Sequence, residues 1–163
     1  MEFLDKFSRL LNQTLLWFAG VFLVGMILLT CSNIFLRIVW IPVRGTFEIM
    51  GFLGATATAF ALGYTQMKKG HIAIDILVCS FSKKTQGILN GINYLILAIF
   101  FAVVSWQISK YATTLLKSGE VTETLRIIYY PFTYGVALGC AALSLVFLVD
   151  FFKSVLPRKE DEE

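Results

Sequence analysis

The chain offers almost no side chains suited to binding haem or transition metals. Its 163 residues contain one histidine, His71, and three isolated cysteines, Cys31, Cys79 and Cys140. One histidine excludes haem ligation by a histidine pair within the chain, and the absence of a CxxC motif leaves metal clusters and disulfide exchange without a sequence basis. We therefore expect no metal, no cofactor and no catalytic residue, and we interpret Cys31 and Cys140 as small apolar side chains.

Charge is also scarce. Only 15% of the residues are charged and 57% are hydrophobic, which excludes a water-soluble domain. The net charge of +3 is dispersed, without a basic stripe, so nucleic acid is not an expected partner.

What the sequence does contain is four long apolar runs without a charged residue. Each approaches or exceeds the roughly 20 residues that a helix needs to cross a bilayer, and backbone in lipid must satisfy its own hydrogen bonds. The sequence predicts an all-α membrane protein that forms one four-helix domain over residues 1–163. The uncharged runs are 14–36, 49–67, 85–109 and 127–149; the expected spans, which extend slightly beyond two of them, are 14–36, 47–68, 85–109 and 127–151, followed by a short charged tail at 157–163.

Two segments outside the spans are also rich in apolar residues. Residues 1–13 form an amphipathic pattern that we expect to lie in the interface and to run into the first span. Residues 71–78 are too short, and too interrupted by Asp75, to cross the membrane. We predict that this second segment is an interfacial arm between the second and third spans.

Local signals mark the ends of the helices. Thr46 can cap the second span, with Glu48 in its first turn, and Arg44 is placed to pair with Glu48 if the helix begins early. Pro131 suits the first turn of the fourth span; alternatively, that helix begins near Arg126 and Pro131 kinks it.

The distribution of basic residues predicts the orientation. Nine of the fourteen Lys and Arg residues lie on the side of the two termini and five on the other side. Because cytoplasmic loops carry an excess of Lys and Arg, we expect both termini to be cytoplasmic.

Small residues recur every four positions in three of the spans. The longest series, in the second span, consists of Gly51, Ala55, Ala59 and Gly63; shorter pairs are Gly87 and Gly91, and Gly135 and Gly139. Such series let helix backbones approach closely. The second span is therefore expected to contact another helix, either of this chain or of a partner.

The middle of the spans lacks the ionisable groups that transporters place near the bilayer midplane. Only mildly polar side chains occur there: Thr56, Thr58, Asn90, Asn93, Gln107 and Ser144. Charged residues instead flank the spans. We interpret the lysines there as anchors to lipid headgroups, and Arg37, Arg44, Glu48, His71 and Asp75 as candidates for subunit or structural contacts.

Three stretches in this region resemble the small membrane (Q-type) subunit of tripartite ATP-independent periplasmic (TRAP) transporters. They are Leu36-Arg37, the stretch Gly45-Thr46-Phe47-Glu48, and Lys69-Gly70-His71-Ile72-Ala73-Ile74-Asp75. The chain length and the four spans agree with that family. Many members have a Trp just before the acidic residue, where this chain has Gly45-Thr46.

The resemblance implies a non-catalytic partner in the bacterial inner membrane. In that family a large multispanning subunit binds sodium and solute, a periplasmic binding protein delivers an organic anion, and the small subunit is a scaffold for the large one. The expected function is thus a supporting role in sodium symport, with the large subunit, the binding protein and membrane lipids as partners.

A self-contained homo-oligomeric exporter is the alternative of another class. Such an exporter needs a membrane-embedded carboxylate, and the candidate nearest to a span is Glu48, at its end. An integral membrane enzyme has less support, because His71 and Asp75 have no nucleophile placed beside them.

Overall fold

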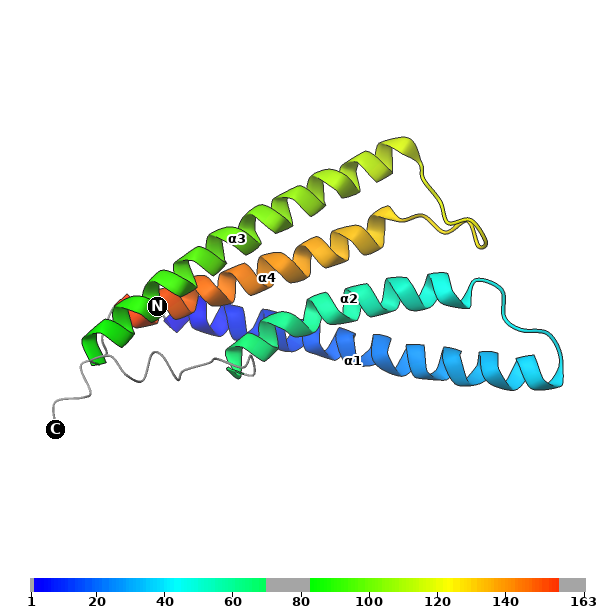
Figure 1. Ribbon diagram of the computed structural model, residues 1–163, viewed down its shortest axis with the longest axis horizontal. Coiled ribbons are helices and arrows are strands. Elements are labelled where there is room, and N and C mark those ends of the chain that lie inside the picture. The colour runs from blue at the N-terminus through cyan, green and yellow to red at the C-terminus, as the bar shows by residue number, and fades with distance from the viewer. Residues whose placement is uncertain (1, 70–82, 156–163) are drawn as a thin grey trace.

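The computed structural model describes residues 2–69 and 83–155, and its architecture is four long helices (Figure 1). The helices are α1 (Glu2–Val39), α2 (Thr46–Met67), α3 (Lys83–Ser118) and α4 (Tyr130–Val155). All four are long and apolar enough to cross a membrane. The prediction of an all-α protein with four membrane-spanning helices is confirmed.

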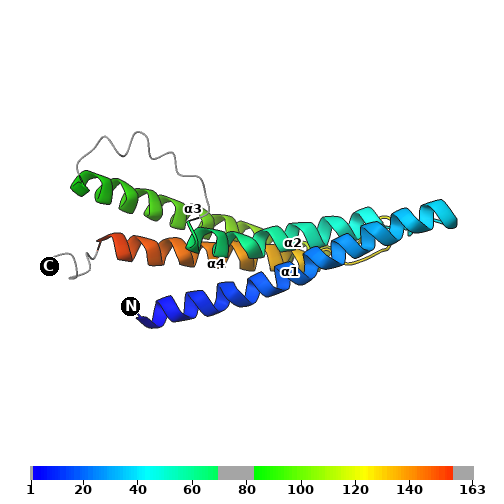
Figure 2. The same cartoon turned by 90° about the horizontal axis from the view of Figure 1, so that it is seen from below.

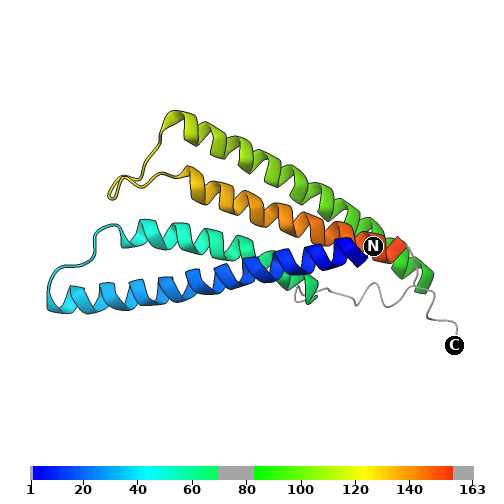
Figure 3. The ribbon, with the colours of Figure 1, turned by 180° about the vertical axis from the view of Figure 1, so that it is seen from behind.

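The helices form two antiparallel hairpins, α1–α2 and α3–α4. The helix α2 packs against both α1 and α4, whereas α3 packs chiefly against α4, so the spatial order is α1, α2, α4, α3. The outer helices α1 and α3 approach each other near the N-terminus and spread apart towards the two connecting loops, as Figure 1 and Figure 3 show from opposite sides. Seen from below, the arrangement is elongated (Figure 2).

The core lies around α4. In α4, 44% of the residues in the most apolar stretch are buried. The corresponding share is only 11% in α1 and 11% in α3. The central cluster is formed by Ala98 of α3 with Leu143 and Phe147 of α4. Cys140 is buried in α4, as expected of a small apolar side chain, whereas Cys31 is exposed on α1.

The N-terminal amphipathic segment continues directly into the first span, so that α1 is one uninterrupted helix. Its packed face consists of Ser8, Asn12, Leu15 and Ala19, while the apolar residues Leu4, Phe7 and Leu10 stay exposed. Two small polar side chains of this segment, Ser8 and Asn12, therefore lie at its packed face. At about 1.5 Å per residue, α1 and α3 each exceed about 50 Å, longer than the roughly 30 Å hydrocarbon core.

Two helix starts differ from the sequence-based expectation. The N-cap of α2 is Gly45, with a left-handed φ of 72° and no side-chain cap; the expectation that Thr46 caps the helix was wrong. The Thr46 hydroxyl instead donates a hydrogen bond to the Val43 carbonyl at 2.8 Å. The helix α4 begins at Tyr130 rather than at residue 127, because Ile127 and Ile128 pair with the preceding loop, and Pro131 therefore lies in the first turn.

Candidate subunit-contact site

Glu48 joins the start of α2 to the loop between α3 and α4. Its carboxylate accepts hydrogen bonds from the backbone N–H of Thr124 at 2.8 Å and of Leu125 at 3.1 Å. Arg44 is exposed and forms no ion pair with Glu48, and Arg37 is exposed in the last turn of α1. Glu48 thus contacts backbone donors across the two hairpins instead of pairing with a neighbouring cation.

The loop that Glu48 binds is a small hairpin. The N–H of Thr122 donates to the Ile127 carbonyl at 2.9 Å, and the N–H of Ile127 donates to the Thr122 hydroxyl at 3.1 Å. Thr122 is buried, and Arg126 turns the chain with a left-handed φ of 53°. Internal hydrogen bonds therefore hold the backbone that faces Glu48 in a defined shape.

Gly45 brings the α1–α2 connection against this hairpin. A Cβ at position 45 would overlap the side chain of Leu125, and the left-handed φ also favours glycine. The glycine of the Gly45–Glu48 stretch therefore serves both the turn and the contact between loops.

The small-residue series of α2 divides into a packed half and an exposed half. Ala59 and Gly63 are buried, whereas Gly51 and Ala55 are exposed. A Cβ on Gly139 of α4 would lie 2.6 Å from the backbone of Ala59, and Gly63 faces the Asn12 side chain of α1. The packed half thus serves contacts within this chain, whereas a Cβ on Gly51, in the exposed half, would meet no atom within 4 Å.

A second group of polar contacts lies where the N-terminal part of α1 meets the C-terminal ends of α2 and α4. The side-chain amide of Gln66 donates to Asp150 at 3.2 Å, linking α2 to α4. Lys153 pairs with Asp5 at 2.8 Å, linking α4 to α1. Both ends of the α2–α4 contact are therefore held by polar groups: Glu48 with the loop at one end and Gln66 with Asp150 at the other.

Asn12 lies at the packed face of α1 and is completely buried. Its amide N–H donates to the Ser8 carbonyl at 2.8 Å, while its Oδ1 has no hydrogen-bond partner. The absence of a side chain at Gly63 leaves the space that the Asn12 amide occupies.

The mildly polar residues of the spans bond mainly to helix backbone. The hydroxyls of Thr56 and Thr58 donate to carbonyls one turn earlier in α2, each at 2.8 Å. Ser144 donates to the Ala98 carbonyl of α3 at 2.8 Å, whereas Asn90, Asn93 and Gln107 are exposed on α3. Within residues 2–69 and 83–155, no group of three or more His, Cys, Asp or Glu side chains is placed to hold a metal ion.

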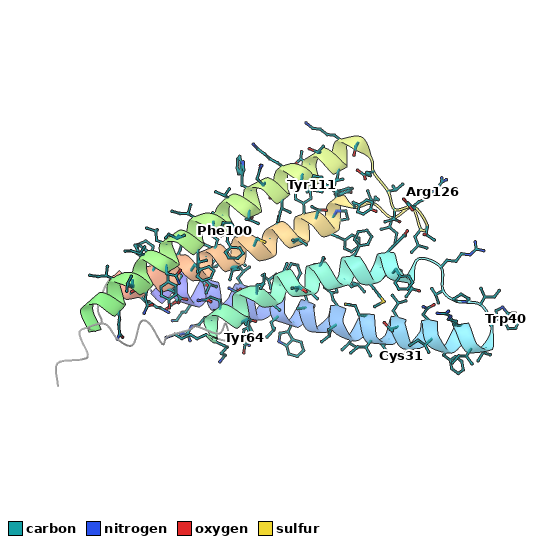
Figure 4. All side chains as sticks on the ribbon, viewed as in Figure 1. Cys31, Trp40, Tyr64, Phe100, Tyr111 and Arg126 are labelled. Atoms are coloured by element: carbon teal, nitrogen blue, oxygen red, sulfur yellow. The ribbon has the colours of Figure 1, made fainter. Side chains whose placement is uncertain are left out.

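The outer surfaces of α1 and α3 carry many exposed large apolar side chains. Trp17, Val24 and Phe35 of α1 are more than half exposed, as are Phe100 and Trp106 of α3. Figure 4 shows Phe100, Tyr111 and Trp40 on the outside of the helices and loop that bear them. These surfaces fit an apolar environment, either lipid or another membrane subunit.

The comparison with known families decides the assignment. The family model described as "Tripartite ATP-independent periplasmic transporters, DctQ component" matches residues 26–156. The chain belongs to the DctQ family. No curated protein and no solved structure matches it.

As a DctQ protein, the chain is the small membrane component of a TRAP transporter, and the resemblance stated from the sequence is confirmed. The DctQ family functions with a large membrane component, DctM, and a periplasmic component, DctP. The match includes Arg37, Arg44, Glu48 and the complete small-residue series of α2. The motif residues His71 and Asp75 lie outside the residues that the structure describes.

Sequence reasoning missed the contacts of Gln66, Asp150, Ser8 and Asn12. Asp150 follows an apolar run, and Gln66 comes shortly before two lysines. The sequence around each residue therefore predicts only a polar side chain at the end of a helix. Their meeting depends on α2 packing beside α4, which no local pattern indicates. Polar residues on the N-terminal segment were a usable signal, because a helix interface within a membrane often contains them.

Proposed function

We propose that this DctQ protein is a non-catalytic scaffold for the large transport subunit in sodium-coupled uptake of an organic anion delivered by the periplasmic binding protein. The observation that carries the proposal is the use of polar side chains inside the spans. Thr56 and Ser144 bond to helix backbone, and the two carboxylates in α2 and α4, Glu48 and Asp150, bond to the loop and to Gln66. This pattern supports a packing role rather than a solute path through the chain.

The exposed apolar faces of α1 and α3 support the presence of a large partner within the membrane. We propose that the exposed half of the α2 series, Gly51 and Ala55, is available to a helix of the large subunit, because small residues allow close backbone approach. Arg37 and Arg44, exposed beside the α1–α2 connection, are proposed contacts for the large subunit or the binding protein. We also place His71 and Asp75 among the proposed interface residues.

Reconstitution in liposomes tests the scaffold role. The complete complex with its binding protein should accumulate an organic anion when a sodium gradient is applied, and the purified DctQ chain alone should not. Sodium-driven uptake by the chain alone would overturn the proposal and favour a self-contained transporter. Omission of the DctQ chain from the complex should reduce uptake, and unchanged uptake would also contradict the proposal.

A further inference from the structure

A cleft opens at the end of the molecule where the N-terminus of α1 meets the C-terminal ends of α2 and α4. Its volume is about 370 Å³. Ionic side chains line it from α1, from α4 and from Lys68 just after α2, and Tyr64, labelled in Figure 4, lies in its wall. The remainder of the wall includes three apolar side chains, those of Met67, Val146 and Val149. The cleft therefore combines a charged part with an apolar part.

The charged part has an excess of cations. The lining includes Arg9, Lys68 and Lys153, and two carboxylates, Asp5 and Asp150, which together give a net charge of +1. Lys153 is paired with Asp5 at 2.8 Å, and Asp150 accepts the Gln66 hydrogen bond.

Arg9 and Lys68 are the cations that remain available. Among the side chains that the structure describes, neither has a carboxylate at ion-pair distance. The ammonium of Lys68 lies 5.8 Å from the centre of the Tyr64 ring. A guanidinium and an ammonium that face one cleft, and that pair with no carboxylate of the described residues, are suited to an anion with several oxygen atoms.

The position of the cleft along the helices indicates the source of that anion. Lys68 directly follows the last residue of α2, and Arg9 precedes the uncharged stretch of α1, so both lie where helices leave the hydrocarbon. Lipid phosphates occupy the same level. Free phosphate would make no use of Met67, Val146 and Val149, whereas a phospholipid places an acyl chain beside its phosphate.

We propose that this cleft binds one glycerophospholipid, with the phosphodiester held between Arg9 and Lys68. The upper part of an acyl chain lies along Met67, Val146 and Val149. The bound lipid adds a contact between α1, α2 and α4, where Asp5–Lys153 and Gln66–Asp150 already join them. The site is independent of the scaffold role and is a property of this chain.

Binding of short-chain lipids to the full chain in a neutral detergent tests the proposal. Native mass spectrometry would measure the dissociation constants of dioctanoyl phosphatidylglycerol, dioctanoylglycerol and inorganic phosphate. The phospholipid should bind at least about tenfold more tightly than either of the others, because only it provides both the phosphate and the chains. Equal binding of dioctanoylglycerol would overturn the phosphate contact, and equal binding of inorganic phosphate would overturn the lipid assignment.

A matched pair of double variants distinguishes phospholipid binding in the cleft from unspecific attraction of the lipid phosphate to any basic residue. Arg9→Gln with Lys68→Gln removes the proposed ligands. Lys6→Gln with Lys69→Gln removes the same charge from exposed neighbours outside the cleft lining. The first pair should weaken phospholipid binding about tenfold, and the second should leave it nearly unchanged. Equal weakening by the two pairs would contradict the proposal; the wild-type comparison remains decisive if a variant does not fold.

Discussion

Gly139 of α4 lies so close to Ala59 of α2 that a Cβ on the glycine would be 2.6 Å from the Ala59 carbonyl carbon and oxygen. The obstacle is backbone, which cannot rotate away as a side chain does. Gly139→Ala should therefore lower the free energy of unfolding by about 1–3 kcal/mol, because α2 and α4 must separate. Equilibrium unfolding of the variant and the wild type in mixed detergent would measure this loss of free energy. Gly20→Ala is the control, since nothing lies within 4 Å of a Cβ there; equal losses would contradict the close contact.

Gly63 faces a side chain, and its substitution should be milder. A Cβ there would overlap the Oδ1 of Asn12, whose amide can turn aside. Gly63→Ala should destabilise the chain by less than Gly139→Ala does, and adding Asn12→Ala should recover part of the loss because it removes the overlap. The same unfolding measurement checks both variants. Absence of any recovery in the double variant would show that another neighbour limits the space.

Gln66 and Asp150 should be energetically coupled. Replacing Asp150 with Leu leaves the buried Gln66 amide without its acceptor and should lower the free energy of unfolding by about 1–3 kcal/mol. Replacing both with Leu should be less harmful than the sum of the single effects. A double-mutant cycle would measure the coupling, and additive effects would mean that the hydrogen bond does not stabilise the fold.

Glu48→Ala should loosen the hairpin between α3 and α4. The variant removes the acceptor of the Thr124 and Leu125 N–H groups, so these amides should exchange with deuterium faster. Glu123→Ala, in the same loop and exposed, is the matched control and should leave exchange unchanged. Equal exchange in the Glu48 variant and the wild type would show that the carboxylate does not hold the loop.

The orientation is tested by cysteine labelling in a cysteine-free background. The exposed residues Lys6 and Ser118 lie at opposite ends of the helices, and each is replaced by Cys in turn. A membrane-impermeant reagent added outside should label position 118 only, because the bias of basic residues predicts cytoplasmic termini. Labelling of position 6 alone would invert the orientation.

The helices were predictable because membrane crossing requires a long uncharged run, and this requirement is visible residue by residue. It was also predictable that small residues would lie at helix contacts: Gly135 faces Thr56 of α2, and Gly139 faces Ala59 of α2. Which half of the α2 series packs within the chain was not predictable, because Gly51, Ala55, Ala59 and Gly63 have the same spacing. Only the crossing of α2 with α1 and α4 distinguishes them.

The polar contacts of the candidate site were less predictable for a geometric reason. Glu48 lies 76 residues before Thr124, and Gln66 lies 84 residues before Asp150. Periodicity describes one helix and carries no information on which helix lies beside it. Arg44 seemed a suitable partner for Glu48 because it is near in sequence, but the free N–H groups of a distant hairpin take that place.

The central position of α4 has a consequence for the order in which the protein is assembled. The α1–α2 hairpin can form as soon as both helices have entered the membrane, since they pack directly on each other. The helix α3 packs chiefly against α4, which is the last helix to be synthesised. Until then α3 lacks its principal protein neighbour, and lipid must surround it. The fold is therefore completed only when the final span inserts, and a ribosome that stops before residue 130 leaves two separate parts rather than a smaller version of the protein.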